Sequence, residues 1–204
     1  MGKTKSLQAQ FGLARVIADL KNPKMAPLAA EELQNVELSR NARFAFEQIA
    51  STAGTDLVRI AQVLLKADSS DVRQSGLRLL LRSGDKSQAA GLALESALKD
   101  TASEVRVLAA YALSQQGNKA ALPVLIEGTK SADRLSQQYG MFGLALFKTK
   151  ESSAAIADAI LKTPQLGRLG IQSLQRQGTA DAARSLGRVL SEGTASNKAT
   201  ALQA

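Results

Sequence analysis

The sequence predicts an all-α fold, an α-solenoid in which antiparallel helix pairs stack into a superhelical array. Apolar residues recur at spacings of three and four along most of the 204 residues, as they do on one face of an α-helix. A single helical-hairpin pattern returns about every 30 residues, a period typical of solenoid repeats. No stretch alternates apolar and polar residues in the way a half-buried strand would.

The clearest hairpin occupies residues 100–127. Its first half places Val105, Leu108 and Leu113 on one helical face, and Gly117 marks the end of that helix. The second half carries a similar apolar stripe. Neither helix can bury its apolar face alone, so neighbouring copies of the hairpin must cover it.

Five segments carry copies of this pattern. They are 42–54, 71–84, 104–117, 139–147 and 174–178. The first is related to the second by an offset of 30 residues, the second to the third by 33, and the fourth to 105–113 by 34. Repeats at this period indicate a solenoid in which each unit contacts only its neighbours.

An acidic residue followed by Val-Arg, then Ala-Ala-x-Ala-Leu and a glycine turn, resembles the HEAT repeat, and most of all its short variant named after phycobilisome (bilin) lyases. The resemblance extends from about Met25 to the C-terminus and is strongest at 71–99 and 103–130. It implies that the Val-Arg helices line the concave face of the solenoid. HEAT repeats serve as scaffolds, enzyme adaptors, lyase subunits and some nucleic-acid binders, so the resemblance specifies a fold more sharply than a function.

We expect residues 1–204 to form one domain. It begins with a capping helix at 6–21 and continues with five to six hairpins from 25 to 204, the last of them cut short. The first predicted helix after the cap is 26–37, and Ser39 or Asn41 caps the next one, which runs to about residue 53. The later predicted helices are 55–66, 71–83, 87–99, 103–116, 119–130, 133–148, 152–162, 165–177 and 180–191, with the start of another at 194–204.

One segment departs from the pattern, because Gly140 and Gly143 lie inside the predicted helix 133–148. Each glycine inside a helix costs about 1 kcal/mol relative to alanine. The two glycines make room for Phe142 and Phe147, admit a closely packed neighbouring helix, or mark a bend.

The residue types present exclude several chemistries. The chain has no Cys and no His, which removes thiol nucleophiles, Ser-His-Asp triads and His- or Cys-ligated metals. Aromatic residues make up 3% and Trp is absent, which disfavours a base-stacking platform. No glycine-rich phosphate loop follows a strand. We therefore expect a protein that is not an enzyme and uses no cofactor.

The N-terminal segment does not have the apolar core of a secretory signal, because Gln8, Gln10, Arg15 and Asp19 interrupt it. No stretch approaches the roughly 20 apolar residues of a membrane span. We therefore expect a cytoplasmic protein without a membrane span.

The formal net charge is +8. An excess of basic residues suits an acidic partner protein or a phosphate backbone. An ordinary solvated surface is the other interpretation, because the basic residues are spread along the chain and do not form runs.

Three arginines, Arg43, Arg73 and Arg106, recur at the same position of the repeat. They form either a ladder for anions or, as the family resemblance implies, structural partners of acids such as Asp68 and Asp100 at the turns between units. We favour the structural role.

The repeat offsets predict three rows of side chains on the face of the Val-Arg helices that lies away from the core. The rows are Phe44, Gln74, Val107, Met141 and Arg168; Gln48, Arg78, Tyr111, Ala145 and Gln172; and Thr52, Arg82, Gln115, Thr149 and Arg176. All of these except Gln48, Thr52, Ala145 and Thr149 are candidate partner-binding residues. Tyr, Arg and Met among amide side chains are typical of protein-binding surfaces; a solvated face with Tyr111 partly packed is the alternative.

These observations lead to one hypothesis and two alternatives. The leading hypothesis is a non-enzymatic scaffold or adaptor that binds another protein, acidic in character if the basic surface takes part, along the concave face. The first alternative is binding of nucleic acid through the basic surface. The second is a subunit of the bilin-lyase type, which the family resemblance alone suggests.

Overall fold

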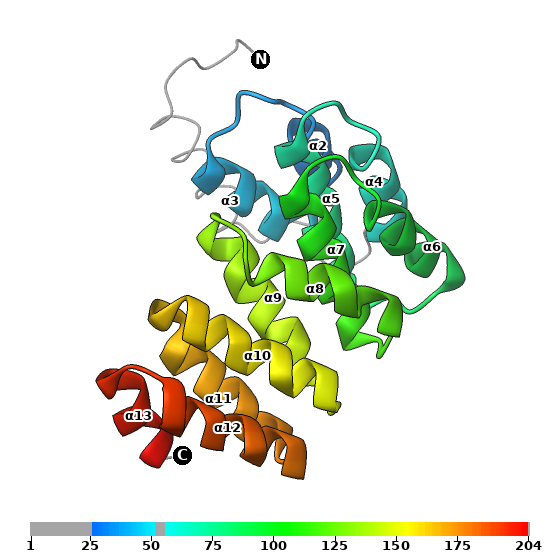
Figure 1. Cartoon of the computed structure of the whole chain (residues 1–204). Helices are drawn as coiled ribbons and strands as arrows, with labels where there is room; N and C mark the ends of the chain where they lie inside the picture. The colour runs from blue at the N-terminus through cyan, green and yellow to red at the C-terminus, as the bar shows by residue number, and fades with distance from the viewer. Residues whose placement is uncertain (1–25, 52–55, 204) are drawn as a thin grey trace. The chain divides into compact units, whose positions relative to one another are not determined.

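The computed structural model describes residues 26–51 and 56–203, and every regular element within these ranges is helical (Figure 1). The chain forms two compact units that divide between Ala93 and Leu94. The capping helix predicted at 6–21 lies outside the described residues, and the single domain stays a prediction. Among the described helices, none is both long enough and apolar enough to cross a membrane.

The first unit contains helices α2 to α5 and the first part of α6. Their bounds are α2 Ala26–Glu32, α3 Arg40–Ala50, α4 Leu57–Leu64, α5 Ser70–Ser83 and α6 Gln88–Ala97. Helix α2 packs on α3, α4 packs on α5, and α3 contacts α5, so two helix pairs stack through their second members. Fully buried leucines such as Leu33, Leu64 and Leu77 form the core of this unit.

Helix α2 is shorter than the predicted helix 26–37. After Glu32 the chain continues in tight turns, in which the N–H of Asn35 donates to the carbonyl of Glu32 at 2.9 Å. The Asn35 side chain then accepts from the N–H of Glu37, a local bond that competes with helix continuation. Ser39 begins α3 by accepting from the N–H of Ala42 at 3.2 Å.

The second unit contains the remainder of α6 and all later elements. Their bounds are α7 Ser103–Gln115, η2 Lys119–Ala121, α8 Leu122–Gly128, α9 Arg134–Leu146, α10 Lys150–Lys162, η3 Pro164–Leu166, α11 Gly167–Gln177, α12 Ala180–Glu192 and α13 Ala195–Leu202. Each of these α-helices corresponds to a helix that the apolar periodicity predicts.

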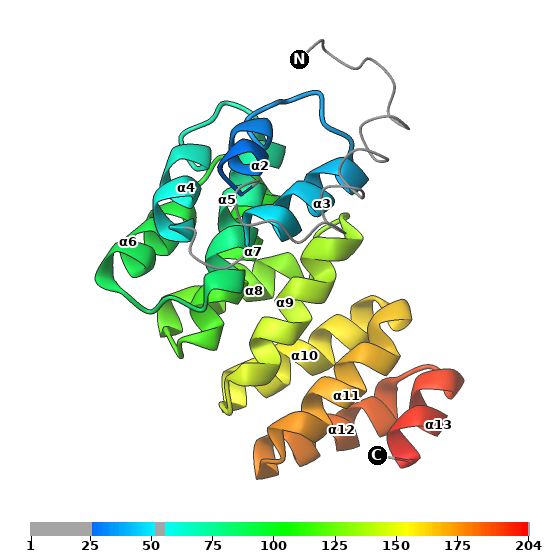
Figure 2. The same cartoon turned by 180° about the vertical axis from the view of Figure 1, so that it is seen from behind.

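The helices of the second unit form two rows (Figure 2). From α7 to α13, each α-helix contacts the next one along the chain. In addition, α7 contacts α9, α9 contacts α11, α11 contacts α13, and α10 contacts both α8 and α12. The first row therefore consists of α7, α9, α11 and α13, and the second row of α8, α10 and α12. This arrangement of stacked helix pairs is an α-solenoid.

Glycines end three of the helices that the repeat pattern relates. Gly84, Gly117 and Gly178 follow α5, α7 and α11 with φ angles of 62°, 73° and 60°. This left-handed conformation is strained for residues with a Cβ atom, so the backbone at these turns of the repeat requires glycine.

Gly140 and Gly143 allow α9 to pack closely on α8. A Cβ atom at position 140 would lie 2.8 Å from the carbonyl oxygen of Leu125, and one at position 143 would lie 2.4 Å from its Cδ2 atom. Both distances are shorter than carbon contacts allow. Of the three predicted roles for these glycines, the structure supports close packing against a neighbouring helix.

Candidate protein-binding surface

The first-row helices of the second unit share a burial pattern that defines their register. Buried Ala109 and Ala110 of α7 correspond to buried Gly140 and Met141 of α9, an offset of 31. The buried Gly140 and Met141 correspond in turn to buried Gly170 and Ile171 of α11, an offset of 30. The offset of 34 predicted for α9 is therefore wrong by three positions. On α9, the residues that continue the predicted rows are Gln138, Phe142 and Leu146.

Two predicted partner-binding residues belong to the core. The first, Met141, is fully buried because it occupies the position of Ala110. Ala145, a member of the second predicted row but not a binding candidate, is buried on the same helix. Val107 is 2% exposed because α8 ends against it: a Cβ atom at Gly128 would lie 2.8 Å from Val107 Cγ1. The prediction that Val107 and Met141 contact a partner is therefore wrong.

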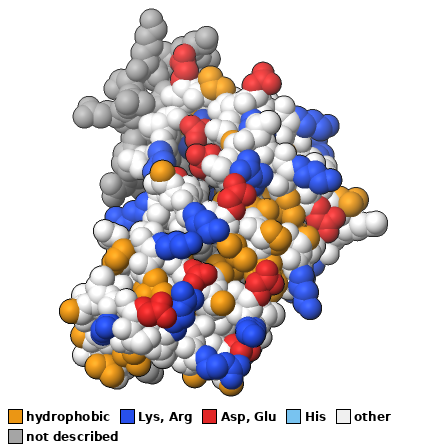
Figure 3. Space-filling model, viewed as in Figure 1, with side chains coloured by type: hydrophobic (Ala, Val, Ile, Leu, Met, Phe, Trp, Pro, Cys, Tyr) orange, Lys and Arg blue, Asp and Glu red, His pale blue; other side chains and the backbone are white. Residues whose placement is uncertain are grey.

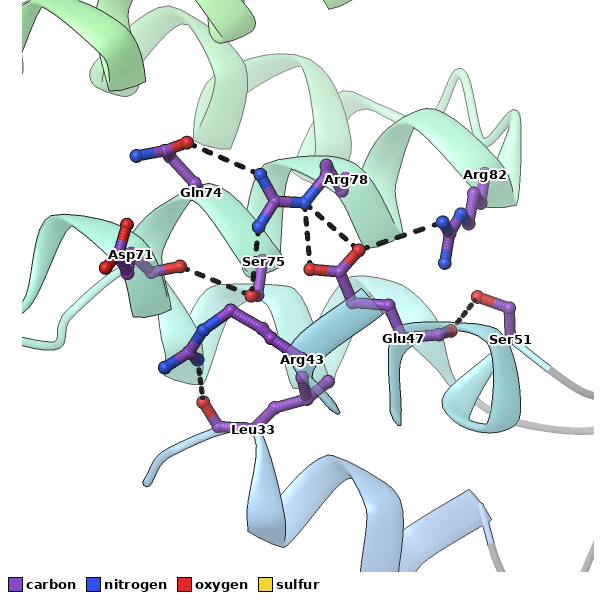
Figure 4. Close-up of polar contacts among 9 residues, drawn as sticks. All are labelled: Leu33, Arg43, Glu47, Ser51, Asp71, Gln74, Ser75, Arg78 and Arg82. Atoms are coloured by element: carbon purple, nitrogen blue, oxygen red, sulfur yellow. Dashed lines mark hydrogen bonds and ion pairs between the residues drawn. The ribbon is translucent and has the colours of Figure 1, made fainter. Parts of the chain in front are cut away.

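In the first unit, the predicted rows meet at a buried carboxylate (Figure 4). Glu47 of α3 has no exposed side-chain surface, and Arg78 Nε of α5 donates to its two oxygens at 2.8 and 3.0 Å. Arg82 Nη2 lies 3.7 Å from Glu47 Oε2. Gln74 accepts from Arg78 at 3.4 Å. Arg78 and Arg82 thus connect α3 to α5, and a partner protein would have to compete with Glu47 for them.

Phe44 lies beside this cluster and is 56% exposed. The Arg82 guanidinium carbon is 5.2 Å from the centre of the Phe44 ring, within cation–π distance. Gln48 is exposed on the same helix, while Thr52 lies outside the described residues. On α3, the exposed members of the predicted rows are therefore one aromatic ring and one amide.

The arginines that recur in register have structural partners. Arg43 donates to the carbonyl oxygens of Leu33 and Asn35 at 2.9 Å, and burial lowers the pKa of its guanidinium. Arg73 donates to the carbonyls of Ala67 and Asp68, and Arg106 to those of Asp100 and Thr101. Each arginine satisfies carbonyl groups in the turn that precedes its own helix.

The predicted acid–arginine pairing therefore takes a different form. Asp68 and Asp100 contribute main-chain carbonyl oxygens to these bonds, and the Asp100 carboxylate accepts from the N–H of Ala102. A carboxylate partner for Arg106 comes from Glu127 of α8, at 2.7 Å. In α9, Gln137 occupies the equivalent helix position and donates to the carbonyl of Ser131. The recurrent position thus supports the turns.

The first row of the second unit carries an apolar ridge, which consists of Leu135, Tyr139, Phe142 and Leu146 of α9. Spacings of four, three and four residues place these side chains on one helical face. Leu135 and Leu146 are 39% and 43% exposed, and the two aromatic side chains are partly exposed. From Leu135 to Leu146 the ridge is about 16 Å long at the rise of an α-helix.

Tyr111 of α7 extends the ridge toward the neighbouring helix. Its ring centre lies 5.2 Å from that of Tyr139, with the two planes inclined at 33°. Tyr111 is thus partly packed and still partly exposed, as the sequence allowed. Gln115, one turn further along α7, is exposed.

On the other side of the ridge, α11 presents exposed Arg168, Gln172 and Arg176 at spacings of four. By the offset of 30, these residues continue the positions of Gln138, Phe142 and Leu146. Within the described part of the chain, neither arginine takes part in an ion pair or hydrogen bond. Their guanidinium groups are therefore available to a partner.

Polar groups buried elsewhere in the second unit are satisfied internally. The Gln177 amide donates to the carbonyls of Leu144 and Phe147, at 3.0 and 2.7 Å, and accepts from the Ser153 hydroxyl. Thr149, a member of the third predicted row, caps α10 through reciprocal bonds with Ser152. In residues 26–51 and 56–203, no cluster of three or more acidic side chains is arranged to hold a metal ion.

Sequence reasoning missed two features. Glu47 lies at the position of buried Leu77 and Ala110 when the repeats are aligned, so the offsets place an acid in the core register. The apolar ridge has its own signal in the spacing of 135, 139, 142 and 146, which the offset of 34 for α9 obscured.

A family model described as HEAT repeats matches residues 57–139, from the start of α4 into α9. No curated protein matches the chain.

Proposed function

We propose, on the premise that this chain is a HEAT-repeat protein, that it is a non-enzymatic scaffold that binds another protein through the first row of its second unit. The observation that carries the proposal is the apolar ridge on α9. Four neighbouring apolar side chains, with Tyr111 beside them, leave apolar surface in contact with water. Contiguous exposed apolar side chains bordered by polar ones are typical of interaction sites.

The composition of this surface supports the same function. Tyrosine, phenylalanine and arginine are enriched at protein interfaces, and tyrosine and arginine are common among the residues that contribute most to binding. Amide side chains at Gln115, Gln138 and Gln172 provide a polar border that can exchange hydrogen bonds with a partner. The face shown in Figure 3 has basic and acidic side chains interspersed, as an ordinary solvated surface does.

Affinity capture with the full chain tests the proposal. The double substitution L135S/L146S removes apolar area from the ridge at two exposed positions, so the helix core stays intact. V63S/L92S is the matched control, because Val63 and Leu92 are exposed apolar residues of α4 and α6, at 51% and 58%. We expect L135S/L146S to lose the captured protein and V63S/L92S to retain it, with both variants folded by circular dichroism. Capture that survives L135S/L146S would show that the ridge is not the binding surface.

A further inference from the structure

We infer that the partner segment is acidic and amphipathic, with apolar side chains that cover the ridge and carboxylates that pair with Arg168 and Arg176. This inference rests on the proposed function and names the chemistry of the partner at the same surface. Three observations carry it: the charge difference between the two helix rows, the absence of partners for the two arginines among the described residues, and the arrangement of the ridge.

The two rows of the second unit differ in charge. In the second row, Lys119 and Glu127 balance each other in η2 and α8, and α10 and α12 each carry two basic and two acidic residues. In the first row, Glu104 and Arg106 balance each other in α7, and α9, α11 and α13 together carry four basic residues and no acidic one. The net positive charge of these helices therefore lies on α9, which bears the ridge, on α11 beside it and on α13, the next helix of the first row.

The pairing of the arginines follows the same division. In the second row, Arg184 pairs with Asp181, and Arg188 pairs with Asp158 at 2.6 Å and with Glu192 at 3.3 Å. The hydrogen bond to Asp158 raises the pKa of Arg188. Arg168 and Arg176 on α11 have no such partners within the described residues. Carboxylates of a bound segment would supply the charge that the chain supplies itself on α12.

The geometry suits a helical segment. The ridge is about 16 Å long, which corresponds to about three helical turns. A helix with apolar residues at spacings of three and four presents a matching stripe, and this mode of recognition buries an apolar face in an apolar surface. The two arginines are eight residues apart on one face of α11, so acids about two turns apart on the partner would reach both.

Nucleic acid fits this surface less well. Phosphate-backbone binding draws its affinity from many basic contacts, whereas α11 offers two arginines beside the ridge. The rings of Tyr111 and Tyr139 lie against each other, which covers surface that bases would need for stacking. The exposed side chains of Leu135 and Leu146 have neither charge nor hydrogen-bonding groups with which to bind a phosphate or a sugar hydroxyl.

The probe for this inference is a display library of random 16-residue peptides selected against the full chain. We expect the enriched peptides to combine Asp or Glu with apolar residues at spacings of three and four. A synthetic peptide of this kind should bind at least about tenfold more weakly to R168E/R176E, since each contact becomes repulsive. Selection against R168E/R176E should favour Lys and Arg in place of the acids.

K119E/K162E is the matched control, because it makes the same change in net charge at two exposed lysines, one in η2 and one at the end of α10. It should leave the affinity for the acidic peptide within about twofold, since neither lysine lies on the helices that bear the ridge and the two arginines and both charges are exposed to solvent.

The outcomes separate this inference from the proposed function. Enriched peptides that need Leu135 and Leu146 but lack acids, or that bind R168E/R176E unchanged, would overturn the acidic partner and leave the ridge as a protein-binding surface. No ridge-dependent binding of any peptide or captured protein would overturn both. Salt-sensitive binding of a labelled RNA or DNA oligonucleotide that needs the arginines but survives L135S/L146S would replace the acidic segment with nucleic acid.

Discussion

Arg78 Nε donates to both carboxylate oxygens of Glu47, at 2.8 and 3.0 Å, although no part of the Glu47 side chain is exposed to solvent. The pair joins α3 to α5 inside the first unit. A buried carboxylate loses its hydration, so its stability in the fold depends on the cationic groups that surround it. Glu47 and Arg78 thus form a structural contact in which the carboxylate is the vulnerable member.

We expect R78M to destabilise the first unit by about 3 kcal/mol, because it removes the main partner of a buried charge. The double variant E47Q/R78M should be more stable than R78M, since it removes the buried charge as well. Hydrogen exchange of the α3 and α5 amides measures the effect on this unit. R59M is the control, because the Arg59–Asp56 pair is exposed and should change stability by less than about 1 kcal/mol. If E47Q/R78M is no more stable than R78M, the unpaired buried charge is not the cause of the destabilisation.

A second prediction concerns the recurrent arginine position. R106M removes bonds to the carbonyls of Asp100 and Thr101 and to Glu127, and we expect a cost of about 1–3 kcal/mol. R106Q should cost less, because Gln137 of α9 makes the corresponding bond to Ser131 with an amide. Urea unfolding of the two variants measures the difference. Equal losses in R106M and R106Q would mean that the carbonyl bonds contribute little.

The sequence predicts the helices well and the surface less well, for physical reasons. Helix positions follow from apolar spacing, which is a local property, so each described α-helix from α3 onward lies close to its predicted range. The alignment of α9 with α7 is harder to predict, because α9 lacks the residues that mark the repeat. Gly140 and Gly143 stand where α7 has Ala109 and Ala112, so the Ala-Ala-x-Ala signal disappears while the packing role remains.

The candidate surface was partly predictable for a related reason. Arg168, Gln172 and Arg176 are exposed in the predicted order, because α11 keeps the spacing of the repeat. Val107 is buried because Gly128 allows the end of α8 to approach it, a tertiary contact that no local pattern encodes. Similarly, Gln177 precedes Gly178, which ends α11, and resembles a surface residue, yet its amide is buried against carbonyls at the C-terminal end of α9.

The Gln177 amide gives a third prediction. Q177L keeps the approximate volume but leaves the carbonyls of Leu144 and Phe147 without that donor, and we expect a loss of about 1–3 kcal/mol. Q175L, two residues earlier at an exposed position of α11, should change stability by less than about 0.5 kcal/mol. Thermal unfolding by circular dichroism compares them. A Q177L variant as stable as Q175L would show that the buried network is not needed.

Two glycine-to-alanine substitutions should act in opposite directions. In G140A the new methyl group would lie 2.8 Å from the Leu125 carbonyl oxygen and 2.9 Å from the Thr129 nitrogen, both main-chain atoms that move only with α8. We expect a loss of about 1–3 kcal/mol, as for overpacked cores. In G187A nothing lies within 4 Å of the methyl group, so the higher helix propensity of alanine should stabilise α12 by about 0.5–1 kcal/mol. Urea unfolding of the pair tests the packing of α9 on α8, and a stabilising G140A would contradict it.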